Sequence, residues 1–181
     1  LGLSPGGLRA IPDDWSSWLR LFFPINTRHP FAAHHETLYE WAHAVKIGER
    51  SPPLVEILAR GGGKSTAAEM VTVYWAARKA RRYLWYISRT QEQADDHVSS
   101  IGTLLTNDMI AAHYPELADR RVNKFGTVRG WNRNRLWTAD GFVIDARGRD
   151  VASRGVKLDE QRPDGMILDD LDDQADGPKI V

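Results

Sequence analysis

The chain has 181 residues, and its 24 Lys and Arg residues balance its 24 Asp and Glu residues. Hydrophobic residues make up 42% of the sequence, so one domain of this length can bury a substantial core. No apolar run approaches the roughly 18–20 residues of a membrane-spanning helix. The sequence contains no cysteine, which excludes a disulfide framework and a thiolate metal site and agrees with a reducing cytoplasm.

The two ends of the sequence lack the marks of processing or targeting. The first residues contain no Met, no basic segment and no apolar segment of the kind found in a secretory signal. The last residues, Ile180 and Val181, end the chain equally abruptly. We therefore expect a fragment of a longer polypeptide.

The charges are balanced in number but not in distribution. Residues 119–154 hold nine Lys and Arg against four Asp, and residues 159–176 hold eight carboxylates against Arg162 alone. This order indicates an anionic partner near the first stretch and a cation near the second, although two solvated faces would give the same pattern.

Hydrophobic periodicity predicts alternating helices and strands. In chain order we expect a helix capped by Asp13 or Asp14, a helix over 33–46, a strand over Leu54–Ala59, a helix over Ser65–Arg82, a strand over Tyr83–Ser88, a helix from Thr90 to about Leu105, two strands within Asn134–Ala146 and a strand over Gly165–Leu168. The Asp140-Gly141 pair is a strong hairpin signal. The alternation predicts an α/β fold with a mostly parallel central sheet flanked by helices.

The most informative segment joins the expected strand 54–59 to the helix that begins at Ser65. Between them stand Arg60, Gly61, Gly62, Gly63, Lys64, Ser65 and Thr66. Such glycines can turn backbone amides toward phosphate, Lys64 would reach the β- and γ-phosphates of ATP, and Ser65 would bind Mg²⁺. Leu58 stands where the usual phosphate-loop pattern has its first glycine. A glycine-rich turn capped by Ser65, with a solvated Lys64, is the alternative interpretation.

A second segment supplies the acids that a phosphate loop requires. The expected strand 165–168 runs directly into Asp169 and Asp170, which is typical of a Walker B strand whose carboxyl end meets the ligand. Asp169 would hold Mg²⁺ and Asp170 would orient the attacking water. Alone, the segment could equally be a strand that ends in a polar turn.

Taken together, these segments resemble the large terminase subunits, the ATP-driven motors that package DNA into viral capsids. Their order carries the resemblance: Ala59-Arg60-x-x-Gly63-Lys64-Ser65-Thr66 with its missing first glycine, the upstream segment 31–38, Tyr86–Thr90, Ser153-Arg154-Gly155 and Arg162–Asp170. The resemblance covers roughly residues 31–173. It implies an additional-strand (ASCE) P-loop ATPase core over 31–181, preceded by a helical lead-in over 1–30.

The resemblance also implies roles and partners. Arg60 would contact phosphate or couple hydrolysis to motion, and Arg154 would act on the nucleotide of a neighbouring subunit, although a surface arginine is an equal alternative. The chain would assemble as a ring on the portal of a procapsid, work with a small terminase subunit and translocate double-stranded DNA. Its location would be the cytoplasm of an infected bacterial host, and transiently the capsid portal.

Two features depart from the family pattern. Most terminases have Glu where this chain has Asp170, so Asp172 or Asp173 would have to contribute, or the water would be held differently. No C-terminal nuclease can be assigned in this chain. Another ASCE ATPase, such as a helicase or a RecA-like translocase, and a catalytically silent nucleotide-binding module therefore stay open as alternatives.

Aromatic and histidine residues add two weaker expectations. Trp131 and Trp137 lie among the arginines of the basic stretch and could face DNA, but strand alternation favours a core position for Trp137. The histidines His34, His35 and His43 are interpreted as helix-surface or capping residues rather than metal ligands.

Overall fold

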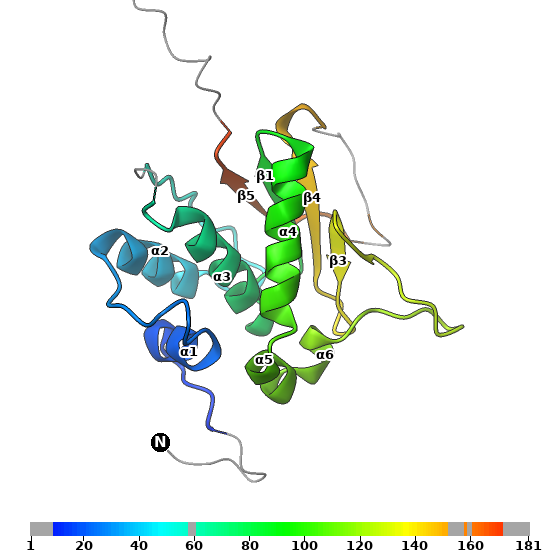
Figure 1. Ribbon diagram of the computed structural model, residues 1–181, viewed down its shortest axis with the longest axis horizontal. Coiled ribbons are helices and arrows are strands. Elements are labelled where there is room, and N and C mark those ends of the chain that lie inside the picture. Colours follow the sequence, from blue (N-terminus) through cyan, green and yellow to red (C-terminus); the bar gives the residue numbers. More distant parts are fainter. Residues whose placement is uncertain (1–8, 58–60, 152–157, 159–160, 172–181) are drawn as a thin grey trace, which may run out of the picture.

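The computed structural model describes residues 9–57, 61–151, 158 and 161–171. Its α-helices are α1 (Trp15–Phe22), α2 (Ala33–Ala44), α3 (Lys64–Ala77), α4 (Gln91–Leu105), α5 (Asp108–His113) and α6 (Pro115–Ala118), with a short 3₁₀ turn over Arg149–Val151. The strands are β1 (Tyr83–Ser88), β2 (Trp131–Asn132), β3 (Arg135–Trp137), β4 (Val143–Gly148) and β5 (Gly165–Asp169). Figure 1 shows α4 lying across the sheet, with α1, α2 and α3 to one side of it.

Capping side chains set where several helices begin. The Asp14 carboxylate accepts a hydrogen bond from the Ser17 amide at the start of α1, and the Thr90 hydroxyl accepts one from the Gln93 amide at the start of α4. Both helix starts are as predicted. Helix α3 ends at Ala77, before the predicted Arg82, because Lys79 adopts a left-handed backbone with φ +57°.

Five strands form one mixed sheet in the order β2-β3-β4-β1-β5. Strand β1 pairs in parallel with both β4 and β5, whereas β2–β3 and β3–β4 are antiparallel. The α/β class is therefore confirmed, but the sheet is not mostly parallel in its pairing. The Asp140-Gly141 turn is the reason, since a tight hairpin can join only antiparallel strands and here joins β3 to β4.

The predicted strand over Leu54–Ala59 is wrong for residues 54–57, which form no strand, and residues 58–59 lie outside the described part. Val55 and Ile57 are 81% and 92% exposed. An apolar sequence forms a strand only when a neighbouring strand satisfies its amides and carbonyls. Strand β5 is the last in the sheet, and within the described residues no strand pairs with its outer edge.

The main hydrophobic core lies between the helices and one face of the sheet. On that face β1 contributes Leu84 and Tyr86, and β4 contributes Ile144 and Ala146. Helix α1 joins the same core, because the Trp18 ring packs edge-on against Tyr74 of α3 with centroids 4.9 Å apart. The opposite face of the sheet carries a second, smaller cluster of Tyr83, Trp137 and Val143.

None of the helices in the described part of the chain combines the length and apolar character that crossing a bilayer requires.

Candidate nucleotide-binding site

The glycine run turns directly into helix α3. Gly61 and Gly63 have φ values of +82° and +74°, a left-handed backbone that glycine adopts without the penalty of a side chain. A Cβ atom at Gly63 would lie 3.2 Å from the His35 Nε2 atom. Helix α3 begins at the next residue, Lys64. The backbone amides of its first turn have no partner within the helix and can therefore bind an anion beside the loop.

Two histidines of helix α2 contact the glycine run. The Nε2 atoms of His34 and His35 lie 3.2 and 2.9 Å from the Gly62 carbonyl oxygen. Sequence reasoning assigned both to the helix surface and gave no sign of this contact, because 27 residues separate His35 from Gly62. The start of α2 therefore contacts the loop through these two side chains.

The central feature of the site is the meeting of Lys64 with two acids. The Lys64 Nζ atom lies 3.9 Å from Asp169 Oδ1 and 3.6 Å from Asp170 Oδ1. The two ends of this contact are 105 residues apart in sequence (169 minus 64). The fold thus brings the residue that starts α3 to the carboxyl end of β5.

Pairing with β1 fixes the position of strand β5. Ser88 is in register with Asp169 at the carboxyl end of the two parallel strands. At the other end, the Asp164 carboxylate accepts hydrogen bonds from the amides of Arg82 and Tyr83 at 2.9 and 3.0 Å. The lead-in to β5 is therefore anchored to β1, and this anchoring sets how far along the sheet Asp169 lies.

Tyr86 and His97, which the sequence analysis did not assign to the site, contact Asp169, and Glu69 contacts His97. The Tyr86 hydroxyl donates to Asp169 Oδ2 at 3.1 Å, His97 Nε2 lies 3.7 Å from that oxygen, and Glu69 Oε1 lies 2.7 Å from His97 Nδ1. The hydrogen bond to Glu69 raises the pKa of His97, while burial acts in the opposite direction. Burial raises the pKa of Tyr86, so its hydroxyl remains a donor. Glu69 was detectable in principle as a carboxylate within the apolar helix 67–76.

The side chains present fit Mg²⁺ bound with a nucleotide. Ser65 in the first turn of α3 and the carboxylate of Asp169 offer hard oxygen ligands, which Mg²⁺ prefers. The Ser88 hydroxyl, buried beside Asp169 in register, has no hydrogen-bond partner among the described residues. The described residues contain no group of three His, Asp or Glu side chains able to hold a metal alone. Phosphate oxygens or water would therefore complete the coordination, as is usual for Mg²⁺.

The structure describes only some of the predicted site residues. Arg60, Arg154, Asp172 and Asp173 lie outside the described residues. The loop consists of Gly61, Gly62 and Gly63, and the first turn of α3 consists of Lys64, Ser65 and Thr66.

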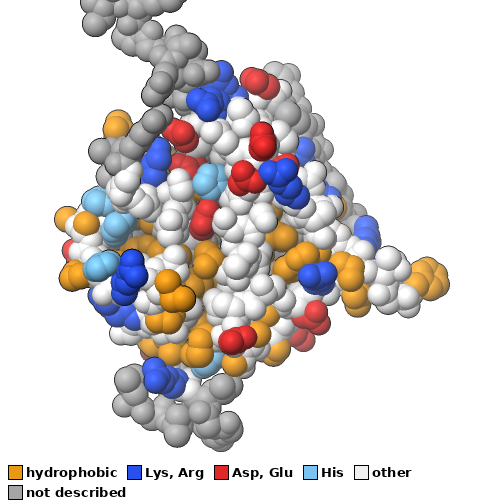
Figure 2. Space-filling view, in the orientation of Figure 1, with side chains coloured by type: hydrophobic (Ala, Val, Ile, Leu, Met, Phe, Trp, Pro, Cys, Tyr) orange, Lys and Arg blue, Asp and Glu red, His pale blue; other side chains and the backbone are white. Residues whose placement is uncertain are grey.

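Figure 2 shows acidic and histidine side chains close together on the upper part of the face over α3 and α4.

A second charged feature is the segment 119–131, here called the basic arm, which projects from the body of the molecule between α6 and β3 (Figure 1). Its two sides form a short antiparallel bridge between Val122 and Val128. Phe125 near its tip is 79% exposed, with Lys124 Nζ 5.0 Å from the ring centroid. The arm therefore presents a cationic and aromatic tip to solvent.

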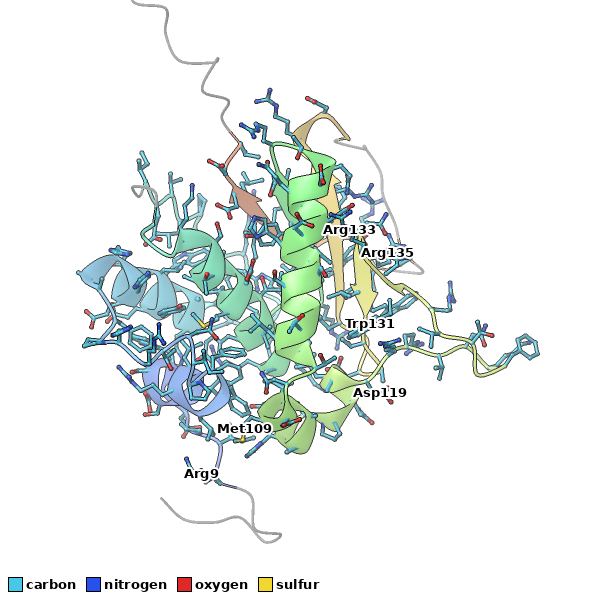
Figure 3. The ribbon with its side chains drawn as sticks, viewed as in Figure 1. Arg9, Met109, Asp119, Trp131, Arg133 and Arg135 are labelled. Atoms are coloured by element: carbon cyan, nitrogen blue, oxygen red, sulfur yellow. The ribbon has the colours of Figure 1, made fainter. Side chains whose placement is uncertain are left out.

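Arginines of the basic arm stack on tryptophans at its base. Arg121 and Arg129 lie over the Trp137 ring at 5.5 and 5.1 Å, and Arg120 lies over Trp131 at 5.3 Å. Trp137 is buried, as the sequence analysis favoured. In Figure 3, the labels of Trp131, Arg135 and Arg133 lie together on the side of the molecule next to α4.

A polar cavity of about 520 Å³ opens at the base of the basic arm. Arg129, Arg135 and Arg147 line it, together with the buried Asp145. Three cations against one carboxylate leave the cavity with net positive charge. The cavity and the arm together form a surface suited to a polyanion.

No family model, no curated protein and no solved structure matches the chain.

Proposed function

We propose that the chain is an ATPase core of the P-loop class, of the additional-strand type, that binds and hydrolyses Mg²⁺-ATP. The observation that carries this proposal is the approach of Lys64 to Asp169 and Asp170 within ion-pair distance, although 105 and 106 positions separate them in sequence (169 minus 64 and 170 minus 64). The parallel arrangement of β4, β1 and β5 supports the class, because ligands of open α/β sheets bind beyond the carboxyl ends of parallel strands.

Within this class we propose a particular protein, the ATPase domain of a viral terminase large subunit. The order of motifs described above supports this proposal, and the basic arm supports double-stranded DNA as the partner. The proposal includes ring assembly at the portal of a procapsid, action with a small terminase subunit, and work in the infected bacterial cytoplasm.

Each residue of the site has a separate role in the proposed hydrolysis of ATP. Lys64, which is paired with the acids and 37% exposed, can turn toward the β- and γ-phosphates, and the amides of the first turn of α3 bind phosphate oxygens. Ser65 and Asp169 hold Mg²⁺, which when bound offsets the charge that develops on the phosphoryl oxygens. Asp170, whose side chain is more exposed than that of Asp169, orients the attacking water.

The test is Mg²⁺-ATP hydrolysis per protomer, measured against protein concentration. Lys64→Ala removes the cation that stabilises transferred charge and is expected to lower the rate about 10²–10³-fold. Lys46→Ala removes an exposed lysine outside the site and is the matched control, expected to leave the rate unchanged. Arg154→Ala tests the proposed action on a neighbouring subunit, for which a loss of about 10³–10⁵-fold is expected.

The outcomes separate the alternatives. A rate that rises with protein concentration and is lost in both Lys64→Ala and Arg154→Ala supports a ring that shares Arg154 between subunits. A rate independent of concentration and kept in Arg154→Ala supports a self-contained ATPase. ATP binding without turnover at any concentration supports a silent nucleotide-binding module and contradicts the proposed hydrolysis.

A further inference from the structure

The two oxygens of Asp169 face different surroundings. Oδ1 is the oxygen nearer Lys64, at 3.9 Å. Oδ2 accepts the hydrogen bond of the Tyr86 hydroxyl and lies 3.7 Å from His97 Nε2. Only one oxygen is therefore directed to the loop, and the other is held by the protein.

The group that faces Oδ2 is itself fixed from two sides. His97 stacks on Tyr86 with ring centroids 4.9 Å apart and an interplanar angle of 27°. Its Nδ1 atom is 2.7 Å from Glu69 Oε1, and the Glu69 side chain is only 13% exposed. These contacts tie together α3, which starts at the phosphate loop, α4, β1 and the end of β5.

The contacts of Oδ2 also limit how the Asp169 carboxylate can turn. Rotation of this carboxylate would separate Oδ2 from both the Tyr86 hydroxyl and His97 Nε2.

We propose that Glu69 and His97 are positioning residues that orient Asp169 so that its other oxygen is presented to Mg²⁺ at the phosphate loop. This role rests on the proposed function, because it concerns the metal of that same site. Partners behind a metal-binding carboxylate orient it, and their loss typically costs about 10–100-fold in metal affinity or activity.

Two substitutions of His97 separate its two contacts. In His97→Asn the amide nitrogen can occupy the place of Nδ1, which keeps the contact to Glu69 and removes the one to Asp169. In His97→Gln the amide nitrogen can reach the place of Nε2 and keep the contact to Asp169. Both variants lose the ring stacked on Tyr86, so they are matched for that loss. Asp96→Asn, on the exposed side of α4, controls for a change of charge on this helix.

The measurement is the apparent Kd of Mg²⁺ in the presence of a non-hydrolysable ATP analogue, obtained by titration calorimetry on the full chain. We expect His97→Asn to raise this Kd about tenfold, and His97→Gln and Asp96→Asn to stay within about twofold of wild type. Glu69→Gln weakens the anchor of His97 and should give an intermediate value. It also provides the test if His97→Asn shows no cooperative thermal unfolding.

Equal Mg²⁺ affinity in His97→Asn and His97→Gln, whether both unchanged or both weakened, overturns the positioning role while leaving the proposed ATPase intact. If His97→Asn does not fold, unchanged Mg²⁺ affinity in Glu69→Gln overturns it in the same way. Binding of the nucleotide without Mg²⁺ should be the same in wild type and variants, since no hydrogen bond or ion pair joins these residues to the described loop residues 61–63. A wild-type chain that binds no Mg²⁺-nucleotide overturns this inference together with the proposed function.

Discussion

At the scale of single residues, the site depends on a backbone conformation that only glycine adopts easily. Gly63 combines a φ of +74° with close approach to His35, and the next residue starts α3. Gly48 has the same φ of +74°, but a Cβ atom added there would have no neighbour within 4 Å. Substituting each glycine by alanine therefore distinguishes the energetic cost of the left-handed backbone, which both positions share, from the cost of steric crowding, which arises only at Gly63.

We expect Gly48→Ala to lower the free energy of unfolding by about 1–2 kcal/mol, the cost of a left-handed backbone for an L-residue. Gly63→Ala should cost more, because His35 must also move. It should weaken Mg²⁺-ATP binding, which Gly48→Ala leaves unchanged. Urea unfolding and nucleotide titration of both variants check this. Equal unfolding costs and equal ATP affinities would contradict the crowding at Gly63.

Asp145 is a second residue whose contribution to the stability of the fold depends on its surroundings. It accepts hydrogen bonds from Arg135 Nη2 at 2.7 Å, from the Tyr83 hydroxyl at 2.7 Å and from Arg147 Nη2 at 3.2 Å. Burial by itself would raise the pKa of Asp145, but these partners together lower it below 3.8. The carboxylate thus links β1, β3 and β4 in its ionised form.

Asp145→Asn should lower the free energy of unfolding at pH 7 by about 3 kcal/mol, since it leaves two partly buried arginines without their anion. A lowered folded pKa gives stability that is present above pH 3.8 and lost as the pH falls through the lower folded value. The difference in free energy of unfolding between Asp145→Asn and wild type should therefore become smaller as the pH is lowered.

Urea unfolding at pH 7 and at decreasing pH measures this difference. Asp96→Asn is the control, because the Asp96–Arg133 pair is exposed and should contribute little at any pH. A constant difference between Asp145→Asn and wild type across the acid range would show that the Asp145 carboxylate is not the group involved.

At the scale of elements, the basic arm is separate from the nucleotide site and has its own expected effect. Lys124 lies over the exposed Phe125 near the tip, and Arg120 lies over Trp131 at the base. Cations presented in this way neutralise phosphates without reading bases. A motor that moves along DNA of any sequence requires contacts of this kind.

Replacing Arg120 and Lys124 together by Gln should reduce the slope of log K against log salt for duplex DNA by about 1.8, or about 0.9 for each phosphate that is no longer neutralised. The matched control replaces Lys46 and Arg50, two exposed cations outside the arm, by Gln and should leave the slope unchanged. Fluorescence anisotropy over a range of salt concentrations measures both. Equal slopes for the two double variants would contradict the proposed role of the arm in DNA binding.

Whole-molecule arrangement explains which elements were predictable. Helices α1 and α4 and strands β1 and β5 follow local signals: apolar periodicity, a capping side chain and a turn residue. The segment 54–57 has an equally apolar sequence, yet it forms no strand. Whether residues 54–57 form a strand depends on pairing with a neighbouring strand, and within the described residues strand β5 has no partner on its outer side.

The sequence by itself determined the α/β class, the glycine turn before α3 and the acids that end β5, because each depends on residues adjacent in the chain. Only the tertiary structure decided that β1 pairs with both β4 and β5 and that Lys64 meets Asp169. It also decided that Glu69 and His97 stand behind that acid. The side-chain contacts of this site join residues from 27 to 106 positions apart (62 minus 35 and 170 minus 64), and no local pattern encodes the register in which two distant elements pack.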